Sequence, residues 1–135
     1  MAQPVYDEEI VATTLILEAG GEGIVGMQAV LNVIDNRVKT RGISRVAVVQ
    51  QPKQMSSLNS ITKHPRHLQN WSGVVSKAKQ HDAWSLALAL VQCDEVPDLT
   101  DGAIYFFSGG LLPKWARPNT IQLTAIIGGH KFYRN

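Results

Sequence analysis

The sequence predicts a single α+β domain that is mainly helical and carries a small antiparallel β element near its C-terminus. Apolar residues recur at helical spacing through most of the chain, from Ile10 onward, which is typical of amphipathic helices. Near the C-terminus, two short apolar segments flank the pair Gly128-Gly129, a pattern that favours a β-hairpin. With 135 residues, 44% of them hydrophobic and 18% charged, the chain can build one core and is too short for two ordinary domains. We therefore expect residues 1–135 to form one domain.

The first two helices are predicted on either side of a glycine-rich break. Residues 8–18 contain an apolar run, and Asp7 is the expected N-cap, followed by acidic residues where the helix dipole favours negative charge. Gly20 and Gly21 are expected to end this helix, because glycine readily adopts the positive φ of a C-terminal cap. From Gly23 the helical pattern resumes, and it should stop near residues 40–42.

The middle of the chain predicts a short helix, a long irregular segment and a long helix. Ser44 can cap a helix that runs to about Val49. Residues 54–71 are rich in Ser, Asn, Gln, His and Pro and lack periodic apolar positions, so we interpret them as a loop. Residues 72–93 predict one continuous helix, the longest of the chain, with Trp84 and Cys93 in its core-facing part.

The C-terminal part predicts three short strands. After the turn residues Asp101-Gly102, residues 103–107 have strand composition. Residues 124–127 and 130–133 form the two arms of the expected hairpin. The strand that contains Tyr105 could pair with this hairpin, which would complete a small antiparallel sheet.

The charge and the cysteine content exclude several classes of function. The net charge is +2, and the nearest basic cluster, residues 63–67, is interrupted by Pro65, so a nucleic-acid partner is not expected. Cys93 is the only cysteine, which rules out an intrachain disulfide and a cysteine metal cluster. His64 and His67 lack a nearby acid that would complete a metal site, and we expect neither a metal nor a cofactor.

The N-terminus and the apolar runs bear on localisation. Residues 1–9 contain acids and no basic residue, unlike the start of a signal peptide. No apolar run reaches the length expected of a membrane span. We therefore expect a protein that is made in the cytoplasm without a signal peptide and that does not insert into a membrane.

The most unusual stretch is Glu18-Ala19-Gly20-Gly21-Glu22, which follows the apolar run of the first helix. Positions i and i+4 lie on one side of a helix, so Glu18 continues the stripe of Val11, Thr14 and Leu15 and should be partly buried. A carboxyl group against apolar surface is costly to ionise, which suits it to donate a proton. The glycines leave room for a substrate to approach.

Five sequence blocks occur in order over nearly the whole chain. They are Glu18-Ala19-x-x-Glu22-x-x-x-Gly26-x-x-Ala29-Val30 with Asn36-Arg37-Val38, then Gln54-Met55-Ser56, Gly102-Ala103, Trp115-Ala116, and Ile127-Gly128-x-His130-x-Phe132-Tyr133. Together they resemble the SleB/CwlJ cell-wall hydrolase family, which includes spore-cortex-lytic enzymes. The resemblance implies a lysozyme-like, transglycosylase-like domain that cuts the glycan strands of peptidoglycan, with Glu18 as the catalytic acid.

The same blocks indicate residues that could contact the sugar. The substrate-binding candidates are Glu22, Gln54, Ser56, Tyr105, Trp115, His130 and Tyr133. Most have a structural alternative: Glu22 could cap the second helix, Gln54 and Ser56 could cap a loop, His130 could be a structural hydrogen-bonding residue, and the tyrosines could be core aromatics.

Aromatic and polar residues outside this set are assigned separately. Trp71, like Trp115, is expected in a loop and could serve as a platform on which a sugar ring stacks. Phe106, Phe107 and Phe132 are expected in the core. Asn36 and Arg37 are expected to tie the end of the second helix to a neighbouring loop.

The predicted reaction uses one acid. Glu18 and Glu22 would lie on one side of one helix, which poorly suits the two opposed carboxylates of most glycosidases. We therefore expect a lytic transglycosylase acting on the bond between N-acetylmuramic acid and N-acetylglucosamine. One alternative is a muramidase in which Asp35, Asp98 or Asp101 assists Glu18, and another is a catalytically degenerate murein-binding module.

The expected partner is the glycan strand of peptidoglycan, and the protein is expected to act as a monomer. A compact lytic enzyme without a leader or a wall-anchoring repeat suits a phage endolysin or a virion-borne wall hydrolase. A holin would release such an enzyme, or the virion would carry it. A bacterial enzyme stored in the cytoplasm is the alternative.

Overall fold

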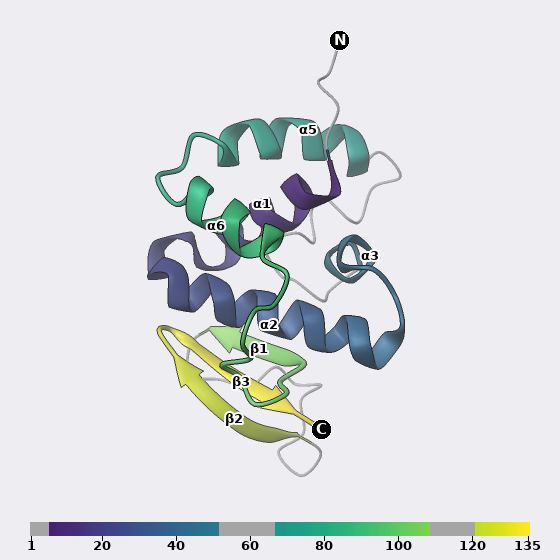
Figure 1. The fold of residues 1–135 in the computed structure, drawn as a ribbon, viewed down its shortest axis with the longest axis vertical. Coiled ribbons are helices and arrows are strands. Elements are labelled where there is room, and N and C mark those ends of the chain that lie inside the picture. The colour runs from purple at the N-terminus through teal and green to yellow at the C-terminus, as the bar shows by residue number, and fades with distance from the viewer. Residues whose placement is uncertain (1–5, 52–66, 109–120) are drawn as a thin grey trace.

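The computed structural model describes residues 6–51, 67–108 and 121–135 and has helices followed by a small sheet (Figure 1). The helical elements are α1 (Asp7–Ala19), the 3-10 turn η1 (Gly20–Glu22), α2 (Gly23–Arg41), α3 (Arg45–Val49), α5 (His67–Ala78) and α6 (Trp84–Gln92). The strands are β1 (Tyr105–Ser108), β2 (Gln122–Ile127) and β3 (His130–Arg134). This arrangement confirms the predicted α+β class with a small antiparallel sheet near the C-terminus.

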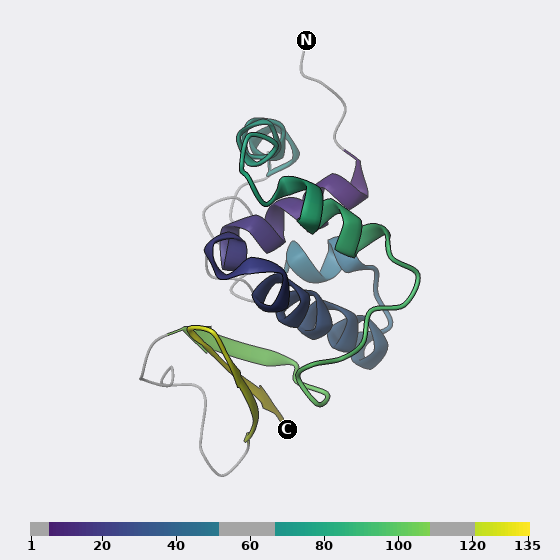
Figure 2. The ribbon, with the colours of Figure 1, turned by 60° about the vertical axis from the view of Figure 1, so that its left-hand side comes forward.

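Helix α2 lies between the other helices and the sheet. Figures 1 and 2 show α1, α5 and α6 on one side of α2 and the three strands on the other. Helix α2 contacts α1, α3 and α6 as well as β1 and β2. The sequence of α2 accordingly carries apolar residues on more than one face, and the helix is buried along most of its length.

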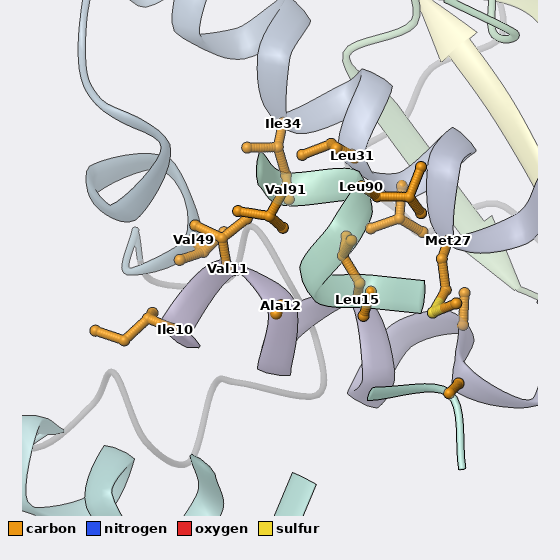
Figure 3. Close-up of a cluster of buried hydrophobic side chains, with 14 of the residues drawn as sticks. Ile10, Val11, Ala12, Leu15, Met27, Leu31, Ile34, Val49, Leu90 and Val91 are labelled. Atoms are coloured by element: carbon orange, nitrogen blue, oxygen red, sulfur yellow. The ribbon is translucent and has the colours of Figure 1, made fainter. Parts of the chain in front are cut away.

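The main core fills the space between the helices. Figure 3 shows side chains from α1, α2, α3 and α6 that meet there. The cluster includes Ile10, Val11, Leu15, Met27, Leu31, Ile34, Val49, Leu90 and Val91. A second, smaller cluster joins α2 to the sheet and consists of Ala29, Val33, Ala103 and Phe132. The helical layer and the sheet are therefore held together through opposite sides of α2.

Helix α1 begins and ends close to its predicted limits, but its cap differs. Tyr6, not Asp7, is the N-cap residue. The backbone N–H of Tyr6 donates to the carboxylate of Glu9 at 3.1 Å. Asp7 instead lies in the first helical turn, where its negative charge interacts favourably with the positive end of the helix dipole.

The break between α1 and α2 is a tight turn of three residues. Gly20, which follows the last residue of α1, has a right-handed conformation with φ of −58°, so the predicted left-handed cap at this position is wrong. The positive φ occurs at Gly23, with φ of 77°. We call residues 18–23, which include the end of α1, all of η1 and the first residue of α2, the elbow.

Two local signals in the next segment are confirmed. Helix α2 ends at Arg41, and Gly42 closes it in the left-handed conformation with φ of 67°. The hydroxyl group of Ser44 accepts the backbone N–H of Ala47 at 3.1 Å and caps α3. Both features depend on residues a few positions apart, which is why they can be predicted from sequence.

The single helix predicted over residues 72–93 is wrong. The structure has two helices, α5 and α6, separated by exposed polar residues around His81. Nδ1 of His81 accepts the backbone N–H of Ala83 at 3.0 Å and stabilises the break. Both helices pack against α1. Helix α2, with 19 residues, is therefore longer than either of them.

The sheet has the strand order β1-β3-β2, and both pairs are antiparallel. Tyr105 pairs with Tyr133, and Ile127 pairs with His130 across the turn at Gly128-Gly129. Gly128 has φ of 58°, which explains the glycine at this position. The predicted hairpin and its pairing with the Tyr105 strand are confirmed.

The stretch Asp7–Arg41 contains a window of 18 residues with a mean hydropathy of 1.4, so by length and composition it passes a criterion for a membrane-spanning helix. The prediction that no run reaches this length was therefore wrong by that criterion. Half of the most apolar window (50%) is buried inside the domain. The chain also turns at η1 within the stretch. Buried core helices of a globular domain satisfy the same criterion.

Candidate active site

Glu18 lies in the last turn of α1, at the start of the elbow, and its side chain is half-buried. Val11, Thr14 and Leu15, the residues that precede it on the predicted stripe, are all buried. The expected partial burial of Glu18 is therefore confirmed. Its position follows from the helical period, because the stripe that packs α1 into the core reaches the end of the helix at Glu18.

Glu22 holds the tip of the β2–β3 hairpin against the elbow. The backbone N–H of Gly129 donates to Oε1 of Glu22 at 2.9 Å. Nε2 of His130, the first residue of β3, lies 3.1 Å from Oε2 of the same carboxylate. Each oxygen of the Glu22 carboxylate is thus paired with a group of the hairpin. Figure 1 shows the hairpin tip beside the start of α2.

Three glycines leave the space that the Glu22 side chain occupies. A Cβ atom at Gly26 would lie 2.7 Å from Cβ of Glu22. A Cβ atom at Gly128 would lie 3.1 Å from Cδ of Glu22, and one at Gly129 would lie 3.0 Å from Oε1. A Cβ atom at Gly26 is therefore excluded, and one at Gly128 or Gly129 would require the end of the Glu22 side chain to shift. Both α2 and the hairpin turn thus approach Glu22 closely.

His130 connects both glutamates of the elbow. Besides its contact with Glu22, Nε2 lies 3.1 Å from the backbone oxygen of Glu18. Both neighbours of Nε2 are hydrogen-bond acceptors, so we assign the ring hydrogen to Nε2. The ring is buried, with 5% of the residue exposed. Phe106 meets it edge to face, with ring centroids 5.3 Å apart.

The other ring nitrogen of His130 is enclosed. Within the part of the chain that the structure describes, Nδ1 is buried and has no hydrogen-bond partner. The Nε2–H of the imidazole is therefore its only paired polar group there. This geometry fits the prediction that His130 is a hydrogen-bonding residue, and it identifies the two atoms that the residue binds.

Arg37 is a buried cation on α2 that binds the segment before β1. Its Nε donates to the backbone oxygen of Ile104 at 2.6 Å, and its guanidinium carbon lies 6.0 Å from the centre of the Tyr105 ring. Burial and the nearby Arg41 lower the pKa of Arg37 to about 10, although Tyr105 and Glu18 act in the opposite direction. The guanidinium group therefore stays charged at neutral pH.

Asn36 reinforces the same connection. Its amide donates to the backbone oxygen of Ala103 at 2.9 Å and to Asp98 at 3.1 Å. The prediction that Asn36 and Arg37 tie the second helix to a neighbouring loop is confirmed. These contacts place β1 against α2 and thereby set the position of the sheet relative to the elbow.

A family model described as Cell Wall Hydrolase matches residues 21–133. The chain belongs to the cell wall hydrolase family. The match contains Glu22, Arg37 and His130, and Glu18 precedes its first residue. No curated protein and no solved structure matches the hydrolase. Family membership identifies peptidoglycan as the substrate and peptidoglycan cleavage as the general activity.

The two tyrosines of the predicted site face each other across the sheet of the hydrolase. Tyr105 on β1 and Tyr133 on β3 are paired in register, so their side chains lie on the same face. Tyr105 is half-buried, and Tyr133 is buried and packs against Phe107. Their contact with a sugar stays a prediction.

The predicted core phenylalanines lie in or next to the core. Phe132 is fully buried, and Phe106 packs against both apolar clusters. Phe107 is half-buried beside Tyr133. The sheet therefore carries a cluster of neighbouring aromatic rings, which extends from the His130 ring along β1 and β3.

Several predicted residues lie outside the described part of the hydrolase. Gln54, Ser56 and Trp115 all fall in residues 52–66 or 109–120, so their proposed roles in substrate binding stay predictions. The same applies to a contribution from His64. Among the described residues, no three His, Cys, Asp or Glu side chains form a group that could hold a metal ion.

Three positions assigned from the sequence differ in the structure. Trp71 lies in α5 and is fully buried, so it cannot be an exposed platform for sugar. Cys93, expected in the core of a long helix, follows the end of α6 and is exposed. Trp84 starts α6, rather than lying in mid-helix, and packs partly buried against the core. The first difference arises because α5 begins at His67, so the loop predicted over residues 54–71 is wrong for its last five residues. The other two arise because the predicted helix is broken before Trp84 and ends at Gln92.

The pairing of Glu22 with His130 was not predicted, although both residues were candidates. The two residues are far apart in the sequence, and neither is unusual by itself. The detectable signal was the set of glycines on both sides, Gly26 after Glu22 and Gly128-Gly129 before His130. A further residue that sequence analysis did not place near the elbow is His81, whose ring lies 3.3 Å from the point where a Cβ of Gly20 would be.

Proposed function

We propose that the hydrolase is a lytic transglycosylase in which Glu18 is the only general acid and base. The observation that carries this proposal is the engagement of Glu22, the other carboxylate of the elbow, by Gly129 and His130. A carboxylate held in this way by the protein is poorly suited to attack a sugar carbon or to activate a water molecule. A mechanism that needs one carboxyl group fits the elbow better than one that needs two.

Two of the three candidate second acids, Asp35 and Asp98, also have structural partners. Both carboxylate oxygens of Asp35 accept hydrogen bonds from Arg45, at 2.7 and 3.0 Å. Asp98 accepts hydrogen bonds from the loop that follows it and from Asn36. Asp101 is exposed in the same turn, with φ of 53°. These contacts support a structural role for Asp35 and Asp98 and thus favour the one-acid mechanism.

The reaction begins with proton transfer. The carboxyl group of Glu18 gives its proton to the glycosidic oxygen, the bond between this oxygen and C1 of N-acetylmuramic acid breaks, and N-acetylglucosamine leaves with the proton. The Glu18 carboxylate then takes the proton of the C6 hydroxyl group of the same muramic acid, and O6 bonds to C1. The product ends in a 1,6-anhydro ring, Glu18 regains its proton, and no water is consumed.

The test is the mass of the products released from purified glycan chains. A transglycosylase leaves anhydro ends, which are lighter by one water molecule than the reducing ends that a muramidase leaves. Replacement of Glu18 by Gln should reduce the rate by about 10²- to 10⁴-fold, while the unfolding midpoint stays unchanged. Reducing ends would identify a muramidase instead. Wild-type rates in the Glu18→Gln enzyme would remove Glu18 from the mechanism, and binding without any product would indicate a murein-binding module.

A further inference from the structure

We propose that Glu22 and His130 are positioning residues that act on Glu18 through its backbone and do not themselves bind the sugar. This inference rests on the proposed role of Glu18. It differs from the sequence-based expectation, in which Glu22 and His130 were candidates for substrate binding. The argument depends on which atoms the two side chains use and on what surrounds those atoms.

The first step concerns the helix end. The backbone oxygen of Glu18 belongs to the last turn of α1, where carbonyl groups lack a partner within the helix. Nε2 of His130 lies 3.1 Å from this oxygen and supplies a donor from outside the helix. A histidine side chain near the C-terminus of a helix can hydrogen-bond one of the last carbonyl groups in this way. His130 therefore fixes the backbone from which the Glu18 side chain projects.

The second step concerns His130 itself. Its Nε2 lies between the oxygen of Glu18 and Oε2 of Glu22, each at 3.1 Å. The carboxylate thus orients the imidazole so that the N–H is directed at the elbow. Phe106 meets the ring edge to face, which restricts its rotation. An imidazole fixed on two sides can define the position of the helix end more closely than a free one.

The third step concerns Glu22. Gly26, Gly128 and Gly129 all approach this side chain so closely that a Cβ atom at any of them would lie within 3.1 Å of it. The Gly129 N–H donates to the carboxylate oxygen that His130 does not use. The hairpin turn and α2 therefore contact the carboxylate from two sides, while 27% of the Glu22 side chain stays exposed. Because each of its oxygens already accepts a hydrogen bond from the hairpin, the carboxylate suits a structural contact better than a group that exchanges hydrogen bonds with incoming sugar.

The experiment uses two matched substitutions of His130. In glutamine, the amide nitrogen is separated from Cβ by the same number of bonds as Nε2 of histidine, so His130→Gln keeps a donor where Glu18 needs one. In asparagine the nitrogen corresponds to Nδ1, so His130→Asn removes that donor. Both substitutions lose the aromatic ring, and the comparison between them isolates the contact with Glu18.

Rates are measured on soluble glycan chains, so that kcat and KM can be separated, and unfolding midpoints are measured in parallel. For His130→Asn we expect kcat to fall by about tenfold to a hundredfold, as for a misplaced catalytic group, with KM nearly unchanged. His130→Gln should recover most of kcat, whereas the unfolding midpoints of the two variants should be similar. A rise in KM with unchanged kcat would indicate substrate binding and overturn the inference. Equal losses of kcat in both variants would also overturn it.

A second variant covers the case in which His130→Asn does not fold. Glu22→Gln keeps an oxygen for the Gly129 N–H but presents an amide group to Nε2 of His130, which weakens the orientation of the ring. A fall in kcat at constant KM supports the inference, and wild-type kinetics overturn it. Exposed Glu95, replaced by Gln, is the control for loss of one negative charge.

Measuring Glu18→Gln beside these variants distinguishes a failure of the positioning role from a failure of the proposed function. An inactive Glu18→Gln enzyme together with wild-type kcat in His130→Asn would overturn the positioning role alone. An active Glu18→Gln enzyme would overturn both the proposed function and the positioning role that rests on it.

Discussion

A methyl group at Gly26 would lie 2.7 Å from Cβ of Glu22, one helical turn earlier in the chain. Atoms of this kind do not approach so closely, and Cβ of Glu22 cannot swing away, because it is bound directly to the backbone. The absence of a side chain at Gly26 therefore allows the elbow to pack onto the first turn of α2. This close packing places Glu22 beneath the hairpin turn.

The first prediction compares two glycines in helices. Gly26→Ala should lower the free energy of unfolding by about 1–3 kcal/mol, because the clash outweighs the better helix propensity of alanine. Gly73→Ala is the control, since a Cβ atom at Gly73 in α5 would meet nothing within 4 Å. That substitution should stabilise the protein by about 0.5–1 kcal/mol. Urea denaturation followed by circular dichroism measures both values. Equal stabilisation by the two substitutions would contradict the packing at Gly26.

The second prediction concerns Asp98 and pH. Burial acts to raise the pKa of this carboxyl group, but hydrogen bonds from Thr100, Gly102 and Asn36 outweigh it and hold the pKa below its ordinary value of 3.8. The folded state thus favours the ionised form. The resulting stability is fully present above the unfolded-state value and is lost as the pH falls through the lower folded-state value.

Because Asp98 is exposed and solvent screens its interactions, Asp98→Asn should reduce the free energy of unfolding by about 0.5–1.5 kcal/mol at pH 7. The difference from the wild type should shrink in acid below the ordinary value. Urea denaturation at neutral and acidic pH measures this difference. Asp94→Asn, at an exposed position, serves as the control for removal of one charge. A difference for Asp98→Asn that is independent of pH would show that the hydrogen bonds do not favour the ionised form.

The third prediction tests the burial of Trp71. Trp71→Ala should destabilise the protein by about 3–5 kcal/mol, as expected for a large core side chain. Trp71→Phe retains much of the packing, and it removes an indole N–H that has no hydrogen-bond partner among the described residues. The Phe variant should therefore be folded and should keep the wild-type KM for glycan chains. A raised KM in a stable Trp71→Phe enzyme would instead support a platform for sugar.

The fourth prediction concerns Cys93. Its thiol group is exposed and donates to the backbone oxygen of Glu95 at 3.1 Å. Because Cys93 is the only cysteine, a thiol reagent should modify the native protein at one site per chain without prior unfolding. Mass spectrometry of the intact protein gives the stoichiometry. Protection of the thiol until denaturant is added would contradict its position after the end of α6.

The helices and strands that were predicted well are those with local signals. Ser44 caps α3 through a residue three positions later. Gly42 ends α2 in a left-handed conformation, and Gly128 turns the hairpin with a positive φ. In each case the interaction that decides the conformation lies within a few residues, so the sequence pattern contains it.

The break between α5 and α6 was missed because the apolar pattern continues on both sides of it. The residues that separate the helices are polar and would also fit the exposed face of one long helix. The structure breaks the helix there, with the His81 ring accepting a hydrogen bond from Ala83. Two further differences have other causes: Trp71 is in the core because α5 already begins at His67, within the predicted loop, and Cys93 is exposed because α6 ends at Gln92.

By itself, the sequence determined the fold class, the two helices around the glycine break, the hairpin and the partial burial of Glu18. These features follow from helical period, capping residues and turn glycines, all of which act over short distances along the chain. Only the tertiary structure decided that Glu22 meets the hairpin at Gly129 and His130 and that His130 binds the Glu18 backbone. These residues are more than a hundred positions apart: 107 separate Glu22 from Gly129, and 112 separate Glu18 from His130. Their contact depends on how α2 packs against the sheet. That packing in turn depends on the side chains on both faces of α2, which contact the other helices on one side and the sheet on the other.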